Sequence, residues 1–93
     1  MNVYLDHNAT APLRPAAREA MVAAMDLVGN ASSVHGHGRA ARQLLEAARR
    51  DVAALVGAPA ARVIFTSGAT EANNLALAAA GGGPVAVSAV EHE

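Results

Sequence analysis

A junction in the middle of the chain places together groups that can bind a phosphate. Residues 64–74 read IFTSGATEANN, so a short apolar run stops at Ser67-Gly68 and a helix-favouring run follows at once. The first backbone N–H groups of a helix have no partner inside the helix, and that end carries partial positive charge. A phosphate placed there accepts several N–H bonds. Gly68 would let the backbone approach closely, and Thr70 adds a hydroxyl donor.

The same spacing fits an ordinary glycine turn with a threonine near the helix cap. Glu71 suits either interpretation, since its carboxylate can bond back to the helix start as half a capping box. The Walker lysine and the G-x-G-x-x-G pattern are both missing, so neither nucleotide fingerprint applies. Spacing alone therefore does not decide between a phosphate-binding helix start and an ordinary glycine turn.

His92 follows the second apolar run, VAVSAV at residues 85–90. Ligands of open α/β sheets bind beyond the carboxyl ends of parallel strands, so we expect Thr70 and His92 at the same edge. There an imidazole can meet an aromatic ring or move a proton. A solvated histidine near the chain end is the alternative.

Two further sets of polar residues suggest simpler roles. His35 and His37 lie in a glycine-rich loop without the three or four ligands that metal sites usually need, so no metal site is predicted. Four arginines of the following helix most simply form a solvated face: Arg39, Arg42, Arg49 and Arg50.

The elements that must position these residues follow from periodicity and turn residues. Apolar spacing predicts helices over residues 16–28, 39–56 and 69–80, with Gly57 and the run 81–84 as stops. Apolar runs at 62–66 and 85–90 are typical of buried strands. The last three elements form a βαβ unit, which predicts an α/β fold with a parallel sheet and a right-handed crossover. Because such sheets are covered on both faces, we expect this fold to be incomplete on its own.

Composition narrows the class of protein further. The chain has 93 residues, a net charge of −1, and seven basic residues that are all arginines, with no cysteine. Disulfides and thiolate metal ligands are therefore excluded within it, and nothing indicates contact with nucleic acid or an anionic membrane. The N-terminus lacks the features of a secretory signal, and no apolar run is long enough for a membrane span. A cytoplasmic location is the expectation.

Four motifs together resemble one enzyme family. They are YLDHNATAP (4–12), GNASSVHGHGRAAR (29–42), VIFTSGATEANNLAL (63–77) and VEHE (90–93). In order and gaps they resemble the pyridoxal-phosphate-dependent cysteine desulfurases. That family belongs to the class V aminotransferase-like enzymes of fold type I, and the branch resembled serves iron–sulfur cluster assembly and tRNA thiolation. The resemblance implies a partial fold type I transferase. Residues 1–15 would form an N-terminal segment with an active-site turn of the small domain, and residues 16–93 the truncated start of the large pyridoxal-phosphate domain.

The resemblance also implies roles for matched residues. Ala69 and Thr70 match the pair that grips the cofactor phosphate through a backbone N–H and a hydroxyl. His92 matches the histidine that stacks on the pyridine ring and takes part in proton transfer. Asn8 and Ala9 match a turn near the substrate carboxylate. The family's Schiff-base lysine and persulfide-forming cysteine have no counterpart among these residues, so the resemblance implies an N-terminal piece that is inactive alone.

The complete enzyme implied is a homodimer that converts L-cysteine to L-alanine. It would pass sulfur as a persulfide to an acceptor or iron–sulfur scaffold protein. Two alternatives remain open at this point. One is a selenocysteine lyase or another class V pyridoxal-phosphate enzyme, and the other is a truncated, non-catalytic binding protein.

Overall fold

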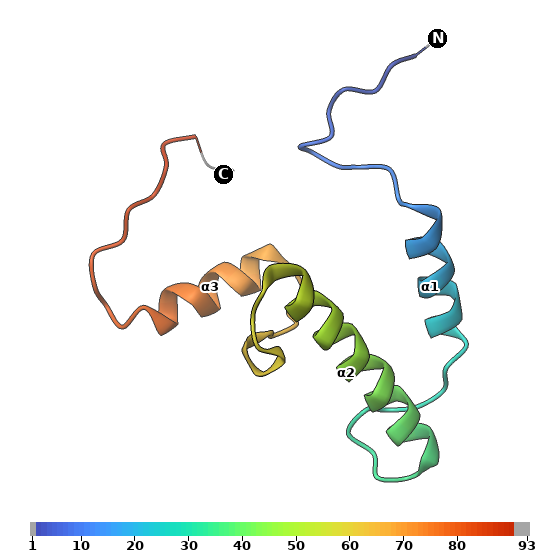
Figure 1. The fold of residues 1–93 in the computed structure, drawn as a ribbon. Helices are drawn as coiled ribbons and strands as arrows, with labels where there is room; N and C mark the ends of the chain where they lie inside the picture. Colours follow the sequence, from blue (N-terminus) through green and yellow to red (C-terminus); the bar gives the residue numbers. More distant parts are fainter. Residues whose placement is uncertain (1, 91–93) are drawn as a thin grey trace. The chain divides into compact units, whose positions relative to one another are not determined.

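The structure, a computed structural model, describes residues 2–90, and its regular elements within that range are all helical (Figure 1). They are α1 (Pro15–Met25), α2 (Gly36–Val56), the short 3-10 helix η1 (Ala60–Arg62) and α3 (Ala69–Ala79). Contacts divide the chain into two compact units, the first ending at Val63 and the second beginning at Ile64. Each unit is described by itself below.

Helix α1 begins where its proline requires. Pro15 occupies the first helical turn, where the missing N–H costs nothing and the fixed φ suits a helix. The preceding Arg14 is extended, with φ −66° and ψ 140°. The helix ends at Met25, three residues before the end predicted from periodicity and ahead of the Gly29-Asn30 stop. The remaining residues of that stretch therefore belong to the loop.

Helix α2 begins three residues earlier than apolar spacing predicts. The imidazole of His35 caps it, because Nδ1 accepts a hydrogen bond from the Gly38 N–H at 3.3 Å. At the other end Gly57 confirms the predicted stop. It has φ 65° and ψ 29°, and its N–H donates to the carbonyls of Ala53 and Ala54. This left-handed conformation after a helix favours glycine.

The glycine-rich loop before α2 packs closely against the start of that helix. Gly38 is buried, and a Cβ at that position would collide with the carbonyl of Ser33. A Cβ at Gly29 would collide with the carbonyl of His37. Both glycines are thus required by close backbone approach, which explains part of the glycine content of this segment.

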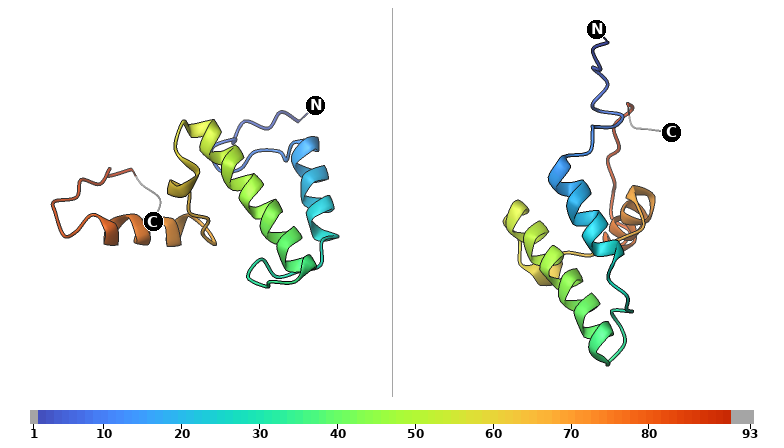
Figure 2. Two further views of the ribbon diagram at one scale, coloured as in Figure 1. Left: turned by 60° about the horizontal axis from the view of Figure 1, so that its bottom comes forward. Right: turned by 90° about the vertical axis from the view of Figure 1, so that its right-hand side faces the viewer.

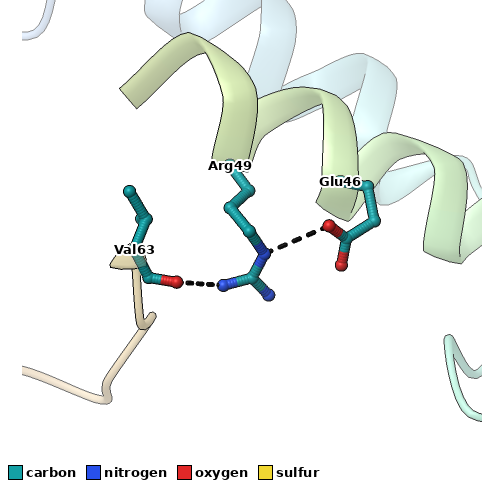
Figure 3. Close-up of polar contacts among 3 residues, drawn as sticks. All are labelled: Glu46, Arg49 and Val63. Carbon is teal, nitrogen blue, oxygen red and sulfur yellow. Dashed lines mark hydrogen bonds and ion pairs between the residues drawn. The ribbon is translucent and has the colours of Figure 1, made fainter. Parts of the chain in front are cut away.

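The chain turns back after α2, so that η1 contacts the end of that helix and forms a corner with it (Figure 2). Ala53 of α2 is 3% exposed. Among the residues that the structure describes, it is the one hydrophobic side chain that is buried. Its carbonyl accepts from the Ala58 N–H at 2.9 Å, which turns the chain back after the helix. Arg49 holds the corner from the side, since its guanidinium binds both the Glu46 carboxylate and the Val63 carbonyl (Figure 3).

The predicted βαβ unit does not appear in this structure. Within residues 2–90 there is no strand: residues 63–66 and 83–88 are irregular, and Arg62 belongs to η1. A strand exists only through hydrogen bonds to a neighbouring strand, and no backbone hydrogen bond joins the two apolar runs. A two-stranded pair is marginal without further strands and covering helices. The βαβ start predicted from the sequence is therefore not seen in this structure, whose helices are joined by irregular segments within residues 2–90.

Candidate functional site

The start of α3 is open at its cap residue. Gly68 precedes the helix with φ 171° and ψ −178°, and no side chain caps the helix there. This backbone is extended, a conformation that any residue adopts. A Cβ at Gly68 would meet no atom within 4 Å. Gly68 is therefore uncovered on the side where a Cβ would stand, and its space does not require a glycine.

Ala69 and Thr70 present their backbone N–H groups at this open end. The first hydrogen bond of the helix runs from the Ala72 N–H to the Gly68 carbonyl, at 3.1 Å. The N–H groups of Ala69 and Thr70 lie before it, where a helix supplies no internal acceptor. Both residues are exposed. Two backbone donors and the positive end of the helix dipole thus lie at this helix start, and Thr70 adds a hydroxyl to the same turn, a donor set suited to a phosphate.

Glu71 folds back over the turn that leads into the helix. Its Oε2 accepts from the Ser67 backbone N–H at 2.7 Å and from the Ser67 hydroxyl at 2.6 Å. These bonds, that of the hydroxyl first, lower the pKa of Glu71 from its ordinary value of 4.5. The predicted reach back to the helix start is present, but its target is Ser67 rather than Gly68. The carboxylate is thus already hydrogen-bonded outside the helix.

Two further side chains bond to the backbone around the start of α3, one across the turn and one within the first turns of the helix. The Thr66 hydroxyl donates to the Gly68 carbonyl at 3.0 Å, and the Asn74 amide donates to the Thr70 carbonyl at 2.9 Å. Short polar side chains commonly bond the backbone a few residues away at turns and helix ends. The density of such residues in the TSGATEANN run was the signal available for finding them.

The predicted substrate-binding pair lies in a turn of the first unit. Ala9 donates its N–H to the Asp6 carbonyl at 3.1 Å, and Asn8 lies inside the same turn. The Tyr4 hydroxyl contacts the carbonyls of Asp6 and Thr10 at 2.8 and 3.0 Å, so it spans this turn from outside. Asn8 and Ala9 are exposed. The residue pattern around Tyr4 does not indicate this supporting role.

Of the histidines singled out in the sequence, one lies beyond the described residues and two lie at the start of α2. His92 lies outside the described residues, so its predicted stacking and proton-transfer role stays a prediction. His35 caps α2, and its ring lies 6.2 Å from that of His37 in an edge-on arrangement. Within residues 2–90, no group of three or more side chains is arranged to hold a metal ion.

The sequence matches the description Aminotransferase class-V over residues 3–93. That match spans nearly the whole chain and includes both the Asn8 turn and the start of α3. The chain belongs to the class-V aminotransferase family. The helix start at Gly68 therefore lies within the part of this class-V chain that matches the family.

Curated relatives of this class-V chain carry two enzyme names. The chain is 54% identical over 74 residues to an IscS-like cysteine desulfurase of Mycobacterium tuberculosis, covering 80% of the chain and 19% of that protein. It is 50% identical over 80 residues to a cysteine desulfurase of Cereibacter sphaeroides, covering 84% and 21%. A human selenocysteine lyase is 46% identical over 76 residues, covering 81% and 17%.

The class-V chain thus spans about a fifth of the length of the curated relatives it matches. None of the helices within residues 2–90 has the length and apolar character that a membrane span requires.

Proposed function

We propose that this chain is the N-terminal part of a pyridoxal-phosphate-dependent cysteine desulfurase. The observation that carries the proposal is the start of α3, which has no side-chain cap and begins with two exposed residues, Ala69 and Thr70. It occurs in a segment of a chain that is 54% identical to an IscS-like cysteine desulfurase. A phosphate-bearing cofactor would find its donors already in place there.

The residues present fit the phosphate of pyridoxal phosphate. Ala69 and Thr70 would hold it through backbone N–H groups, and the Thr70 hydroxyl would add a third donor. Glu71 does not compete for these donors, since its carboxylate is bonded to Ser67. When bound, the cofactor supplies an electron sink for chemistry at the substrate amine-bearing carbon. His92 would stack on its ring and take part in proton transfer.

The rest of the proposal concerns the complete enzyme. It would convert L-cysteine to L-alanine and pass the sulfur as a persulfide to an acceptor or iron–sulfur scaffold protein. Asn8 and Ala9 would lie near the substrate carboxylate. We propose a cytoplasmic homodimer in which residues 1–15 contribute an active-site turn and residues 16–93 begin the large domain. There the apolar runs after η1 and α3 would pair with further strands.

A first experiment reads the gene beyond codon 93. The proposal expects the frame to continue into a segment with a lysine for the Schiff base and a later cysteine loop. A stop codon directly after Glu93 would instead favour a short binding protein.

A second experiment tests Thr70 in the complete polypeptide that the gene encodes. Thr70→Ala removes one hydrogen bond to a charged group, so the affinity for pyridoxal phosphate should fall roughly tenfold to a hundredfold. Thr70→Ser keeps the hydroxyl and should retain most of the affinity. Cofactor retention after dialysis, followed by visible absorbance, measures both. Equal retention by the Ala variant and the unsubstituted protein contradicts the assignment.

A selenocysteine lyase is the second candidate, because relatives of that name match the chain at 46% and 47% identity. The two candidates differ in which substrate the complete protein prefers. Alanine formation from L-cysteine and from L-selenocysteine, measured side by side, separates them. A strong preference for L-selenocysteine would replace the desulfurase proposal and leave the cofactor assignment intact.

A further inference from the structure

One face of α2 concentrates positive charge around a small surface groove. The groove has a volume of about 280 Å³ and is lined by Arg39, Arg42, Gln43, Glu46 and Arg50. It therefore contains three guanidinium groups and one carboxylate. These residues recur at the spacing that places side chains on one side of a helix.

The single carboxylate of this groove is already engaged. Glu46 Oε2 lies 3.2 Å from Nε of Arg49, which also binds the Val63 carbonyl at the α2–η1 corner (Figure 3). The charge of Glu46 is thus balanced by an arginine outside the groove. The groove therefore keeps a net positive charge from its three arginines.

The three arginines of the groove differ in their contacts with the rest of the chain. Arg39 Nη1 donates to the Val34 carbonyl at 2.6 Å, which fixes that guanidinium near the start of α2. Arg42 and Arg50 are exposed and form no ion pair in the part of the chain that the structure describes. They flank Glu46 by one helical turn on either side. Two guanidinium groups are thus available to a ligand, and a third is preplaced beside them.

We infer that this arginine groove docks an acidic segment of a partner protein. Guanidinium groups bind carboxylates through paired N–H bonds, and several carboxylates along an extended segment match arginines spaced along one helix. Nucleic acid fits less well, because it needs an extended positive surface, whereas this chain has a net charge of −1 and only three of its seven arginines line the groove.

The test measures binding of a fluorescein-labelled deca-glutamate peptide to the complete chain by fluorescence anisotropy. Binding should occur at low salt and weaken as salt is added, because exposed charge pairs are screened. The double variant Arg42→Gln/Arg50→Gln should lose about tenfold in affinity, the effect of two exposed charge pairs. Its matched control, Arg14→Gln/Arg18→Gln, changes the same charge at α1 and should keep the affinity.

A third variant shifts the affinity in the opposite direction. Glu46→Gln removes the carboxylate that lines the groove, so the peptide should bind about twofold to fivefold more tightly. Circular dichroism confirms that each variant retains its helical content. Three results would overturn the inference: no binding by the unsubstituted chain, an equal loss in both double variants, or tighter binding of deca-thymidylate than of deca-glutamate.

Discussion

At the scale of single residues, Ser67 and Glu71 form a clamp that fixes the turn ahead of α3. The carboxylate receives two hydrogen bonds from one serine, one from its hydroxyl and one from its backbone. Both bonds favour the ionised carboxylate, which is why the pKa of Glu71 is lowered. The clamp thus keeps a negative charge close to the proposed phosphate donors without occupying them. It makes the turn sensitive to acid.

The pKa of Glu71 provides a direct prediction. Because the folded pKa is lowered, the contribution of this carboxylate to stability is fully present above the ordinary value of 4.5, and it is lost as the pH falls through the lowered value. Ser67→Ala removes the larger cause and should raise the midpoint towards the ordinary value. The carboxyl carbon shift of Glu71, followed by NMR against pH, measures this midpoint. Ser88→Ala, a serine beyond α3, should leave the midpoint unchanged. An unchanged midpoint in the Ser67 variant would show that the hydroxyl does not perturb Glu71.

Residue-level reasoning from the sequence placed the start of a helix at Ala69, as the structure has it, and missed the side chains that support the turn before it. Glu71 was expected to reach back because acidic residues at that helix position commonly do so. The bonds of Thr66 and Asn74 depend on the local path of the backbone, which the spacing of residues does not determine. His35 was not expected as a cap, because imidazole is not among the usual capping groups.

At the scale of elements, the loop before α2 and the first turn of that helix form one packed piece. Gly38 is buried against the Ser33 carbonyl, whereas a Cβ at Gly36 would meet only the end of the Arg39 side chain, at 3.9 Å. Two glycines of the same helical turn therefore have different reasons to be glycine. One is required by contact with the loop, and the other is not.

This contrast predicts opposite outcomes for two equivalent substitutions. Gly38→Ala forces a methyl group into the Ser33 carbonyl and should destabilise the chain by about 1–3 kcal/mol, the usual cost of overpacking. Gly36→Ala should be neutral or slightly stabilising, since alanine favours helix. Urea unfolding followed by circular dichroism measures both. The close packing of the loop would be contradicted if the two variants unfolded at the same urea concentration.

The helices lie close to the ranges that the sequence predicts, whereas the two predicted strands are irregular in the structure. A helix closes its hydrogen bonds within one segment, so periodicity and stops such as Gly57 are sufficient to place it within a few residues. A strand depends on partners that are distant in sequence. The apolar runs at 62–66 and 85–90 suit a buried strand, but without partners in residues 2–90 they remain irregular. The same dependence explains why the residues of each run do not by themselves determine whether it forms a strand.

At the scale of the whole molecule, most of the apolar surface is not buried. Large hydrophobic side chains remain exposed on each helix, among them Met21 at 51%, Leu55 at 85% and Leu77 at 53%. A groove of about 490 Å³ between α1 and α2 is lined largely by alanine and leucine. Small alanine-rich helices bury little area per residue, so the chain gains little hydrophobic stabilisation. This is consistent with a segment that spans about a fifth of its relatives.

The proposed function makes a prediction for the 93-residue chain as a whole. It should release no alanine from L-cysteine in the presence of pyridoxal phosphate, because it contains no lysine for the Schiff base and no cysteine for the persulfide. Quantifying alanine against a no-protein control measures this. A purified full-length cysteine desulfurase is the positive control. Alanine above the no-protein background would mean that the chain uses other residues for catalysis.

The bond from Arg49 to the Val63 carbonyl has a consequence for the order of folding. It closes a loop of 14 residues, and every group that it needs belongs to the first unit. Loops of this size close within roughly 100 ns, whereas a ribosome adds about 5–20 residues each second. The α2–η1 corner can therefore form as soon as Val63 leaves the ribosome, before the residues of α3 have emerged. In a nascent chain the corner of the first unit would then be folded before the second unit is available to fold.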